Sequence, residues 1–176
     1  FSDVGIIAPH HGNDKKPTKM KYLSCVNVLT VMMCGNILNL NAYKKVKGFE
    51  DKLFIDYVDH DFCLRLTCHG YNIIQDNSIS IIHKLGNRSI KRFLFLKFTP
   101  SNHSPERIYY RTRNRFFVYK KYWAEFRGFI IRDFVHFFRE LLSMYFFEDN
   151  KTAKTKMILK GLSDFKKNIY GKFKYN

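Results

Sequence analysis

The residues best suited to chemistry lie in an acidic stretch, residues 48–71, with the sequence GFEDKLFIDYVDHDFCLRLTCHGY. Within it, Asp59 and Asp61 are two residues apart, and Arg65 follows Asp61 by four positions. Two carboxylates this close together can act as a general base and a metal ligand. They can equally cap a helix, whose first amides are unpaired, with Asp61 and Arg65 forming a surface ion pair. The spacing alone leaves both interpretations open.

This stretch stands out because the rest of the chain is strongly basic. The 176 residues include 31 Lys and Arg against 15 Asp and Glu, which gives a formal net charge of +16. Such a balance indicates an anionic partner, which could be a phosphorylated substrate, a lipid surface or nucleic acid. The hydrophobic fraction of 45% argues against a disordered chain. No segment is apolar enough to span a bilayer, and the first residues lack the pattern of a signal peptide.

The elements that would hold the carboxylates alternate between strand and helix. Strands are predicted over residues 2–9, 26–33, 71–74 and 78–83, and helices over 41–48 and 58–69. In the second helix, Phe62, Cys63 and Leu66 share one face, and Gly70 is placed to end the helix. A turn at residues 76–77 separates the last two strands. This alternation predicts an α/β fold built in layers.

Beyond residue 90 the chain becomes a basic, aromatic and helical tail, so we divide it into residues 1–90 and 91–176. One helix is expected where apolar side chains recur at helical spacing, namely Phe126, Ile130, Phe134, Phe137, Leu141 and Tyr145. Basic amphipathic helices of this kind lie on anionic membrane surfaces. The alternatives are packing on the α/β core or in a homo-oligomer, and single-stranded nucleic acid bound by YYRTRNRFFVYKKY. We favour the membrane surface over nucleic acid, because no nucleic-acid-binding motif is present.

The four cysteines do not suggest a chemical role. Cys25, Cys34, Cys63 and Cys68 match neither a zinc knuckle nor a disulfide scaffold in their spacing. The simplest expectation is that they are small core residues in a reducing compartment.

A longer pattern extends on both sides of the acidic stretch. CGN is followed by a Gly-Phe-acid turn, then FIDYVD, then D-x-D-F-C-L-R, then Gly-Tyr and a strand ending in H-x-L-G. This succession resembles the C-terminal half of the catalytic domain of glycosyltransferase family 2, and most closely its rhamnosyltransferase branch. The later SPERIYYRTRNRFF is similar to the segment that follows that domain, so the likeness covers most of residues 1–120. It implies the C-terminal portion of a GT-A mixed sheet, followed by a helical tail.

The resemblance also implies roles for the charged residues. Asp59 falls at the catalytic base, which would accept the proton of an acceptor hydroxyl as that oxygen attacks the anomeric carbon. Asp61 would be a supporting carboxylate, held by Arg65, that shapes the acceptor pocket. Val58 stands where much of the family has an acid, although the rhamnosyltransferase branch tolerates apolar residues there.

Other positions would face the nucleotide-sugar donor. His83 falls where related enzymes place a histidine near the metal and the diphosphate, so it would bind Mn²⁺ or Mg²⁺; alternatively, it only packs at a strand end. Gly35 and Asn36 match a loop of small residues beside the donor sugar, where a missing side chain permits close approach.

The implied activity is inverting transfer of a sugar, most readily rhamnose from dTDP-rhamnose, to a saccharide or lipid-linked acceptor during the synthesis of cell-surface polysaccharide. The enzyme would be cytoplasmic and peripheral on the inner face of the membrane. We expect a nucleotide-binding half with its own metal-binding DxD to precede Phe1, and we expect the isolated chain to be inactive. The alternative is a basic module without catalytic activity that binds nucleic acid or a membrane surface.

Overall fold

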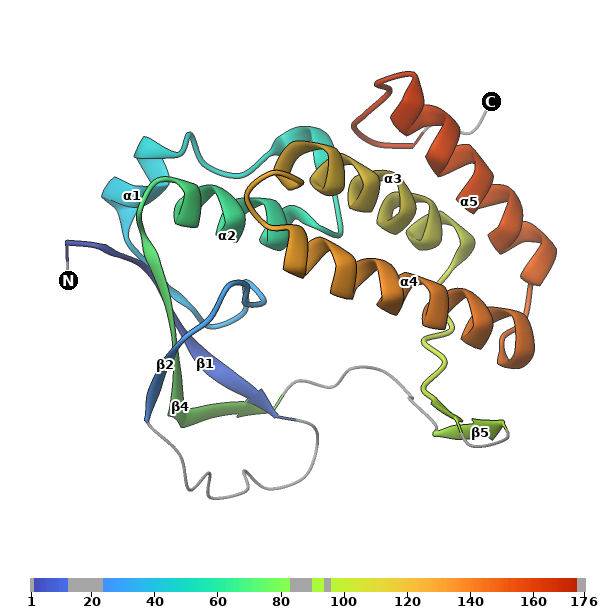
Figure 1. The fold of residues 1–176 in the computed structure, drawn as a ribbon, viewed down its shortest axis with the longest axis horizontal. Coiled ribbons are helices and arrows are strands. Elements are labelled where there is room, and N and C mark those ends of the chain that lie inside the picture. Colours follow the sequence, from blue (N-terminus) through green and yellow to red (C-terminus); the bar gives the residue numbers. More distant parts are fainter. Residues whose placement is uncertain (1, 13–23, 83–89, 94–95, 174–176) are drawn as a thin grey trace. The chain divides into compact units, whose positions relative to one another are not determined.

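The computed structural model of the chain describes residues 2–12, 24–82, 90–93 and 96–173 (Figure 1). The chain divides into two compact units, residues 1–51 with 58–85, and residues 52–57 with 86–176. The first unit contains a mixed sheet and the helix that carries the two aspartates, and the second contains three long helices. The fold is therefore mixed α/β, as the sequence predicts.

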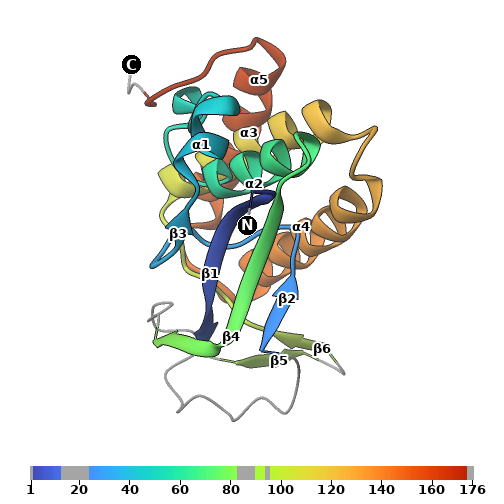
Figure 2. The same cartoon turned by 90° about the vertical axis from the view of Figure 1, so that its left-hand side faces the viewer.

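The first unit is built around a four-stranded sheet with the strand order β2-β4-β1-β3. Its strands are β1 (Val4–Gly12), β2 (Cys25–Asn27), β3 (Ile37–Leu38) and β4 (Asn72–Ile82). The long strands β1 and β4 are parallel and lie side by side, whereas β2 and β3 run antiparallel to them (Figure 2). Parallel neighbours need a crossover connection, which here includes α1 (Leu40–Lys45) and α2 (Val58–Cys68).

The two long strands correct the prediction in one place. Strand β1 does not end at Pro9 but continues to Gly12, and its pairing with β4 shifts between Pro9 and His10. Opposite this shift, Asp76 Oδ1 accepts a hydrogen bond of 2.8 Å from the backbone amide of Ser78. Proline has no amide to donate to the ladder, so the strands accommodate it with an irregularity. The turn expected in β4 is therefore a bulge within one strand.

The segment after β2 also differs from the prediction. The strand expected over residues 26–33 stops at Asn27, and the chain continues as a loop. Helix α1 starts earlier than expected because Asn39, rather than Asn41, is its N-cap. The Asn39 side-chain oxygen accepts hydrogen bonds from the amides of Asn41 and Ala42, at 3.0 and 3.2 Å. These bonds satisfy donors that would otherwise be unpaired at the start of the helix.

Helix α2 packs on the sheet with the apolar face that the sequence predicts. Phe62, Cys63 and Leu66 are fully buried and form one core cluster with side chains of β1 and β4. The helix ends just before Gly70, which has a φ of +81° and so continues the chain in a left-handed conformation. The bounds and the buried face of this helix are confirmed.

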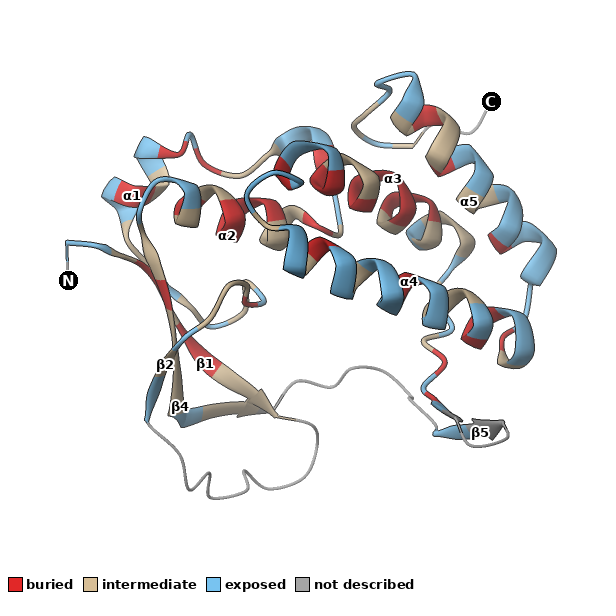
Figure 3. Ribbon diagram, viewed as in Figure 1, coloured by how far each residue is buried: buried red, intermediate tan, exposed pale blue. Residues whose placement is uncertain are grey.

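The second unit contains a small hairpin and three long helices. They are β5 (Lys91–Phe93), β6 (Leu96–Phe98), α3 (Pro105–Tyr122), α4 (Arg127–Phe147) and α5 (Lys151–Lys166). Ser104 caps α3 and Pro105 occupies its first position, where a missing amide costs little. Helix α3 has most of its central residues buried and packs along α5 (Figure 3). A Cβ at Gly161 of α5 would lie 2.8 Å from the backbone oxygen of Tyr109, so only glycine permits this close approach.

Helix α4 forms where predicted but is not oriented as a simple amphipathic helix. Of the expected apolar face, Ile130 and Phe137 are buried, whereas Phe134 and Tyr145 are 42% and 64% exposed. Among the residues of α4, the acid Asp133 instead points toward α3. Packing of the whole apolar face within the protein, which was the alternative to a membrane surface, therefore does not hold for these two aromatic side chains.

Candidate functional site

Asp59 lies in the first turn of α2 and is partly buried. Its Oδ2 atom accepts a hydrogen bond of 3.2 Å from the backbone amide of Met33. Within the described part of the chain, no hydrogen bond to Oδ1 is found. The first turn of a helix is a favourable position for an acidic side chain, because the unpaired amides there carry partial positive charge. The Oδ2 atom of Asp59 is thus fixed by the loop after β2.

The loop that contains Met33 and contacts Asp59 is itself stabilised by hydrogen bonds. Asn36 Nδ2 donates to the backbone oxygen of Met32 at 2.9 Å, and the amide of Cys34 donates to the same oxygen at 2.9 Å. His11 Nε2, at the end of β1, lies 3.0 Å from the backbone oxygen of Cys34. The structure therefore brings together three segments distant in sequence: the end of β1, the loop with Gly35 and Asn36, and the start of α2.

Gly35 is required by the fold at this point. Its φ is +70°, a region that side chains disfavour, and an added Cβ would overlap the Cδ1 atom of Ile81 on β4. The residue itself is exposed. The left-handed backbone thus favours glycine here, and an added methyl group would also displace the end of the Ile81 side chain, independently of any donor sugar.

Asp61 and Arg65 lie on a different side of α2 from Asp59, because residues two apart are separated by about 200° around a helix. Asp61 Oδ2 and Arg65 Nε are 2.8 Å apart, and their side chains are 0% and 14% exposed. Arg65 Nη1 also donates to the backbone oxygen of Val46, at 2.8 Å. The expected ion pair is present, but it is buried rather than at the surface. Because Val46 is the C-cap of α1, the bond from Arg65 links α2 to the end of α1 and so helps to fix the orientation of α2.

Cys63 follows Asp59 by one helical turn, so its suitability as a nucleophile needs to be considered. Burial raises the pKa of this thiol to about 12, and its Sγ atom lies 3.9 Å from the backbone oxygen of Val31. A neutral thiol is a poor nucleophile. Cys63 fits the expectation of a core cysteine, whereas Cys25 and Cys68 are exposed, and none of the four cysteines forms a disulfide.

Metal binding has no support from the described residues. Among residues 2–12, 24–82, 90–93 and 96–173, no three His, Cys, Asp or Glu side chains are grouped as ligands of one ion. His83, the predicted metal ligand, lies outside the described residues. The described donors alone therefore do not form a metal centre.

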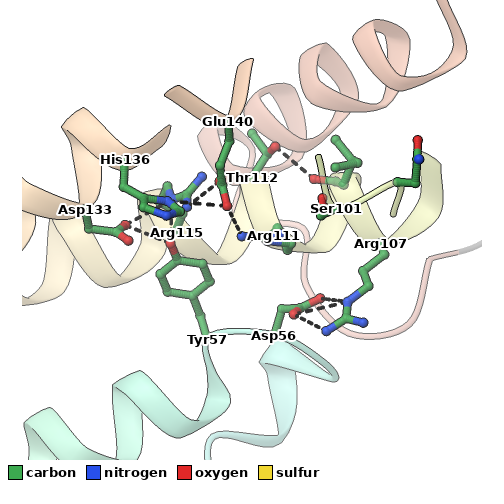
Figure 4. Close-up of polar contacts among 12 residues, drawn as sticks. Asp56, Tyr57, Ser101, Arg107, Arg111, Thr112, Arg115, Asp133, His136 and Glu140 are labelled. Carbon is green, nitrogen blue, oxygen red and sulfur yellow. Dashed lines mark hydrogen bonds and ion pairs between the residues drawn. The ribbon is translucent and has the colours of Figure 1, made fainter. Parts of the chain in front are cut away.

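The second unit contains a buried cluster of charges that the sequence did not predict (Figure 4). Arg115 of α3 is 2% exposed; its Nε atom lies 3.0 Å from Asp133 Oδ2, and its Nη2 atom lies 2.9 Å from Glu140 Oε2. Tyr57 and Tyr119 donate their hydroxyls to the same Asp133 oxygen, at 2.7 and 2.6 Å. Burial opposes ionisation of both acids, yet Arg115 and its neighbours hold the pKa of each below its usual value.

Two neighbours of Arg115 fix the short segment 52–57. Asn114 Nδ2 donates to the backbone oxygens of Leu53, Ile55 and Asp56, at 2.8, 2.7 and 3.0 Å. Arg113, which is fully buried, donates to the backbone oxygen of Leu53 at 3.2 Å. Residues 109–122, the stretch proposed as a nucleic-acid contact, thus have Arg113, Asn114 and Arg115 buried within the unit. The sequence does contain one indication of the charge cluster around Arg115. Asp133 and Glu140 are seven residues apart, so they share one face of α4.

Comparison with known proteins gives one informative similarity. Over 87 residues the chain is 33% identical to the dTDP-rhamnosyl transferase RfbF of Shigella flexneri. The aligned segment is 49% of this chain but only 28% of that protein. No family model matches the chain. No solved structure matches it either. The similarity supports a rhamnosyltransferase-like glycosyltransferase.

Proposed function

We propose that this chain is part of an inverting glycosyltransferase that moves rhamnose from dTDP-rhamnose to a saccharide or lipid-linked acceptor during polysaccharide synthesis. The observation that carries the proposal is the 33% identity to RfbF, a dTDP-rhamnosyl transferase. Membership of glycosyltransferase family 2 and its GT-A fold are part of the proposal. The parallel pair β1 and β4, joined through α2, is compatible with them.

Asp59 is the catalytic base in this proposal. The acceptor oxygen forms a bond to the anomeric carbon while the bond from that carbon to the diphosphate breaks, and dTDP leaves with the bonding electrons. The hydroxyl proton passes to the Oδ1 atom of Asp59. A single displacement needs one base and forms no covalent intermediate. The contact between Asp59 Oδ2 and the Met33 amide supports the role, because it fixes the carboxylate without occupying both oxygens.

The remaining predicted residues have supporting roles. Asp61 and Arg65 position α2, and hence Asp59, through their buried ion pair. Asn36 holds the loop that donates to Asp59, and Gly35 allows that loop to pass Ile81. A divalent ion, Mn²⁺ or Mg²⁺, bound with the help of His83, would offset the charge of the departing diphosphate. We assign no described residue to the nucleotide.

The test is a transfer assay on the polypeptide encoded by the whole reading frame. Rhamnosyl transfer from radiolabelled dTDP-rhamnose to a lipid-linked saccharide is measured for the wild type and for Asp59→Asn. We expect a loss of about 10²- to 10⁴-fold, the usual contribution of a general base. Binding of dTDP-rhamnose, measured by calorimetry, should stay unchanged.

Asp51→Asn is the matched control, because Asp51 is an exposed carboxylate in the preceding turn. It should transfer at the wild-type rate. Near-normal transfer by Asp59→Asn would refute the assigned base. Absence of any transfer from dTDP-rhamnose by the wild type, with transfer from another nucleotide sugar, would refute the donor but leave the base in place.

A further inference from the structure

The outward face of α4 is apolar along most of the helix. Its exposed large apolar side chains are Ile131, Phe134, Val135, Phe138, Leu142, Tyr145 and Phe146. They recur at spacings of three and four residues, so they form one continuous stripe. From residue 131 to residue 146 the stripe is about 22 Å long, at 1.5 Å per residue. Helix α4 is largely exposed in Figure 3. An apolar surface of this extent indicates a binding partner.

The acids of α4 are turned away from this stripe. Asp133 and Glu140 both contact Arg115 of α3, as described above. Two exposed arginines, Arg132 and Arg139, follow the stripe along one edge, and the exposed Arg127 lies at the start of the helix. Within the described residues of α4, the exposed Lys, Arg, Asp and Glu side chains are therefore all arginines. The helix presents an apolar stripe with a cationic border.

We infer that α4 lies flat on an anionic lipid surface, with its stripe at the boundary between headgroups and acyl chains. Phe, Leu and Ile suit that boundary, and the bordering arginines suit lipid phosphates. A second copy of this chain is a poorer occupant, because it would bring another cationic border and a further net charge of +16. Nucleic acid needs cations across the contact rather than at its edge. No helix of the described residues is long and apolar enough to cross a membrane. The inference does not depend on the proposed transfer reaction.

The experiment measures binding of the 176-residue chain to vesicles by flotation. We compare vesicles of pure phosphatidylcholine with vesicles that also contain about 30 mol% phosphatidylglycerol, across a salt series. We expect the chain to float with the anionic vesicles and to be released as salt rises. Replacing both Ile131 and Phe138 with Ser should weaken binding by about tenfold or more, because buried apolar area drives insertion.

Matched variants on α5 distinguish binding through the α4 stripe from nonspecific hydrophobic or electrostatic binding elsewhere on the chain. Leu159→Ser removes a 62% exposed apolar side chain from α5 and should leave binding unchanged. Arg127→Gln with Arg132→Gln should weaken binding about tenfold. Lys151→Gln with Lys156→Gln on α5 removes the same charge and should have a smaller effect. Circular dichroism melts check that each variant is folded.

Four results would overturn the inference. The first is equal flotation with and without phosphatidylglycerol, and the second is an unchanged affinity of the Ile131→Ser, Phe138→Ser variant. The third is a lipid-free dimer, detected by sedimentation, that this variant abolishes while vesicle binding persists. Tighter binding to a single-stranded oligonucleotide than to anionic vesicles at equal salt would also contradict it.

Discussion

The backbone amide of Met33 donates a hydrogen bond to the Oδ2 atom of Asp59, over a distance of 3.2 Å and a separation of 26 residues. The contact joins the loop after β2 to the first turn of α2. The geometry of this candidate site therefore depends on a loop, not only on the helix that carries the acid.

Removing the Asp59 carboxylate should release the Met33 amide. In Asp59→Ala we expect hydrogen exchange at this amide to accelerate about fivefold to tenfold, as a net bond of roughly 1 kcal/mol implies. The amide of Tyr43, which donates to the backbone of Asn39 in the same unit, serves as the control and should be unchanged. An unaltered exchange rate at Met33 would show that the contact does not form in solution.

Gly35→Ala should destabilise the first unit more than Gly70→Ala. Both glycines have positive φ, at +70° and +81°, so both substitutions cost about 1 kcal/mol of backbone strain. At Gly35 the new methyl group also meets Ile81, whereas at Gly70 no atom lies within 4 Å. Urea unfolding should thus show a larger loss for Gly35→Ala. Equal losses would mean that the loop can move away from β4.

Asp61→Asn should be strongly destabilising. The change leaves the charge of Arg65 buried without its partner, which typically costs about 3–5 kcal/mol. Asp3→Asn is the comparison, because Asp3 is exposed and its carboxylate accepts a surface hydrogen bond of 3.0 Å from the Asn72 side chain. It should change the free energy of unfolding by less than about 1 kcal/mol. Similar values for the two variants would place the Asp61 side chain in solvent.

The second unit should lose stability in two steps as the pH falls. Burial and the nearby guanidinium groups of Arg111 and Arg107 lower the pKa of His103 from 6.5 to about 4. Between these values the unfolded chain binds the proton and the folded chain does not, so the free energy of unfolding decreases as the pH drops from 6.5 to 4. From about pH 5 downward the unfolded chain also binds protons that Asp133 and Glu140 do not accept in the fold, because their pKa values are lowered there, so further stability is lost.

The variant His103→Gln isolates the first step. Its free energy of unfolding, measured by urea titration at several pH values, should vary less than that of the wild type between pH 6.5 and about 5, and should then fall as in the wild type. A wild-type slope in that interval would assign the effect to another group.

Helix α2 was predictable because its signals are local. The spacing of Phe62, Cys63 and Leu66 identifies a face, and Gly70 supplies a stop, so both its bounds and its buried side follow from the sequence. The irregular centre of β4 was not predictable in the same way. A turn and a bulge share the same local sequence, and only the pairing with the proline-containing β1 distinguishes them.

The buried arginines show a second limit of sequence patterns. Arg113 and Arg115 look like surface cations, because burying a charge is unfavourable unless partners are present. Those partners come from elsewhere in the chain: carbonyl oxygens of residues 52–57 and carboxylates on α4. For the candidate site, the sequence indicated Asp59 itself, whereas its contact with the Met33 amide required the fold.

Residues 52–57 belong to the second unit although the residues on both sides of them belong to the first, and this constrains how the protein can recombine in evolution. The chain passes between units three times, after residues 51, 57 and 85, so neither unit is a continuous stretch of sequence. Recombination that exchanged the C-terminal half alone would separate Asn114 from the carbonyl groups it binds. The two halves must therefore be inherited together, and natural hybrids should preserve both the hexapeptide and the asparagine that holds it.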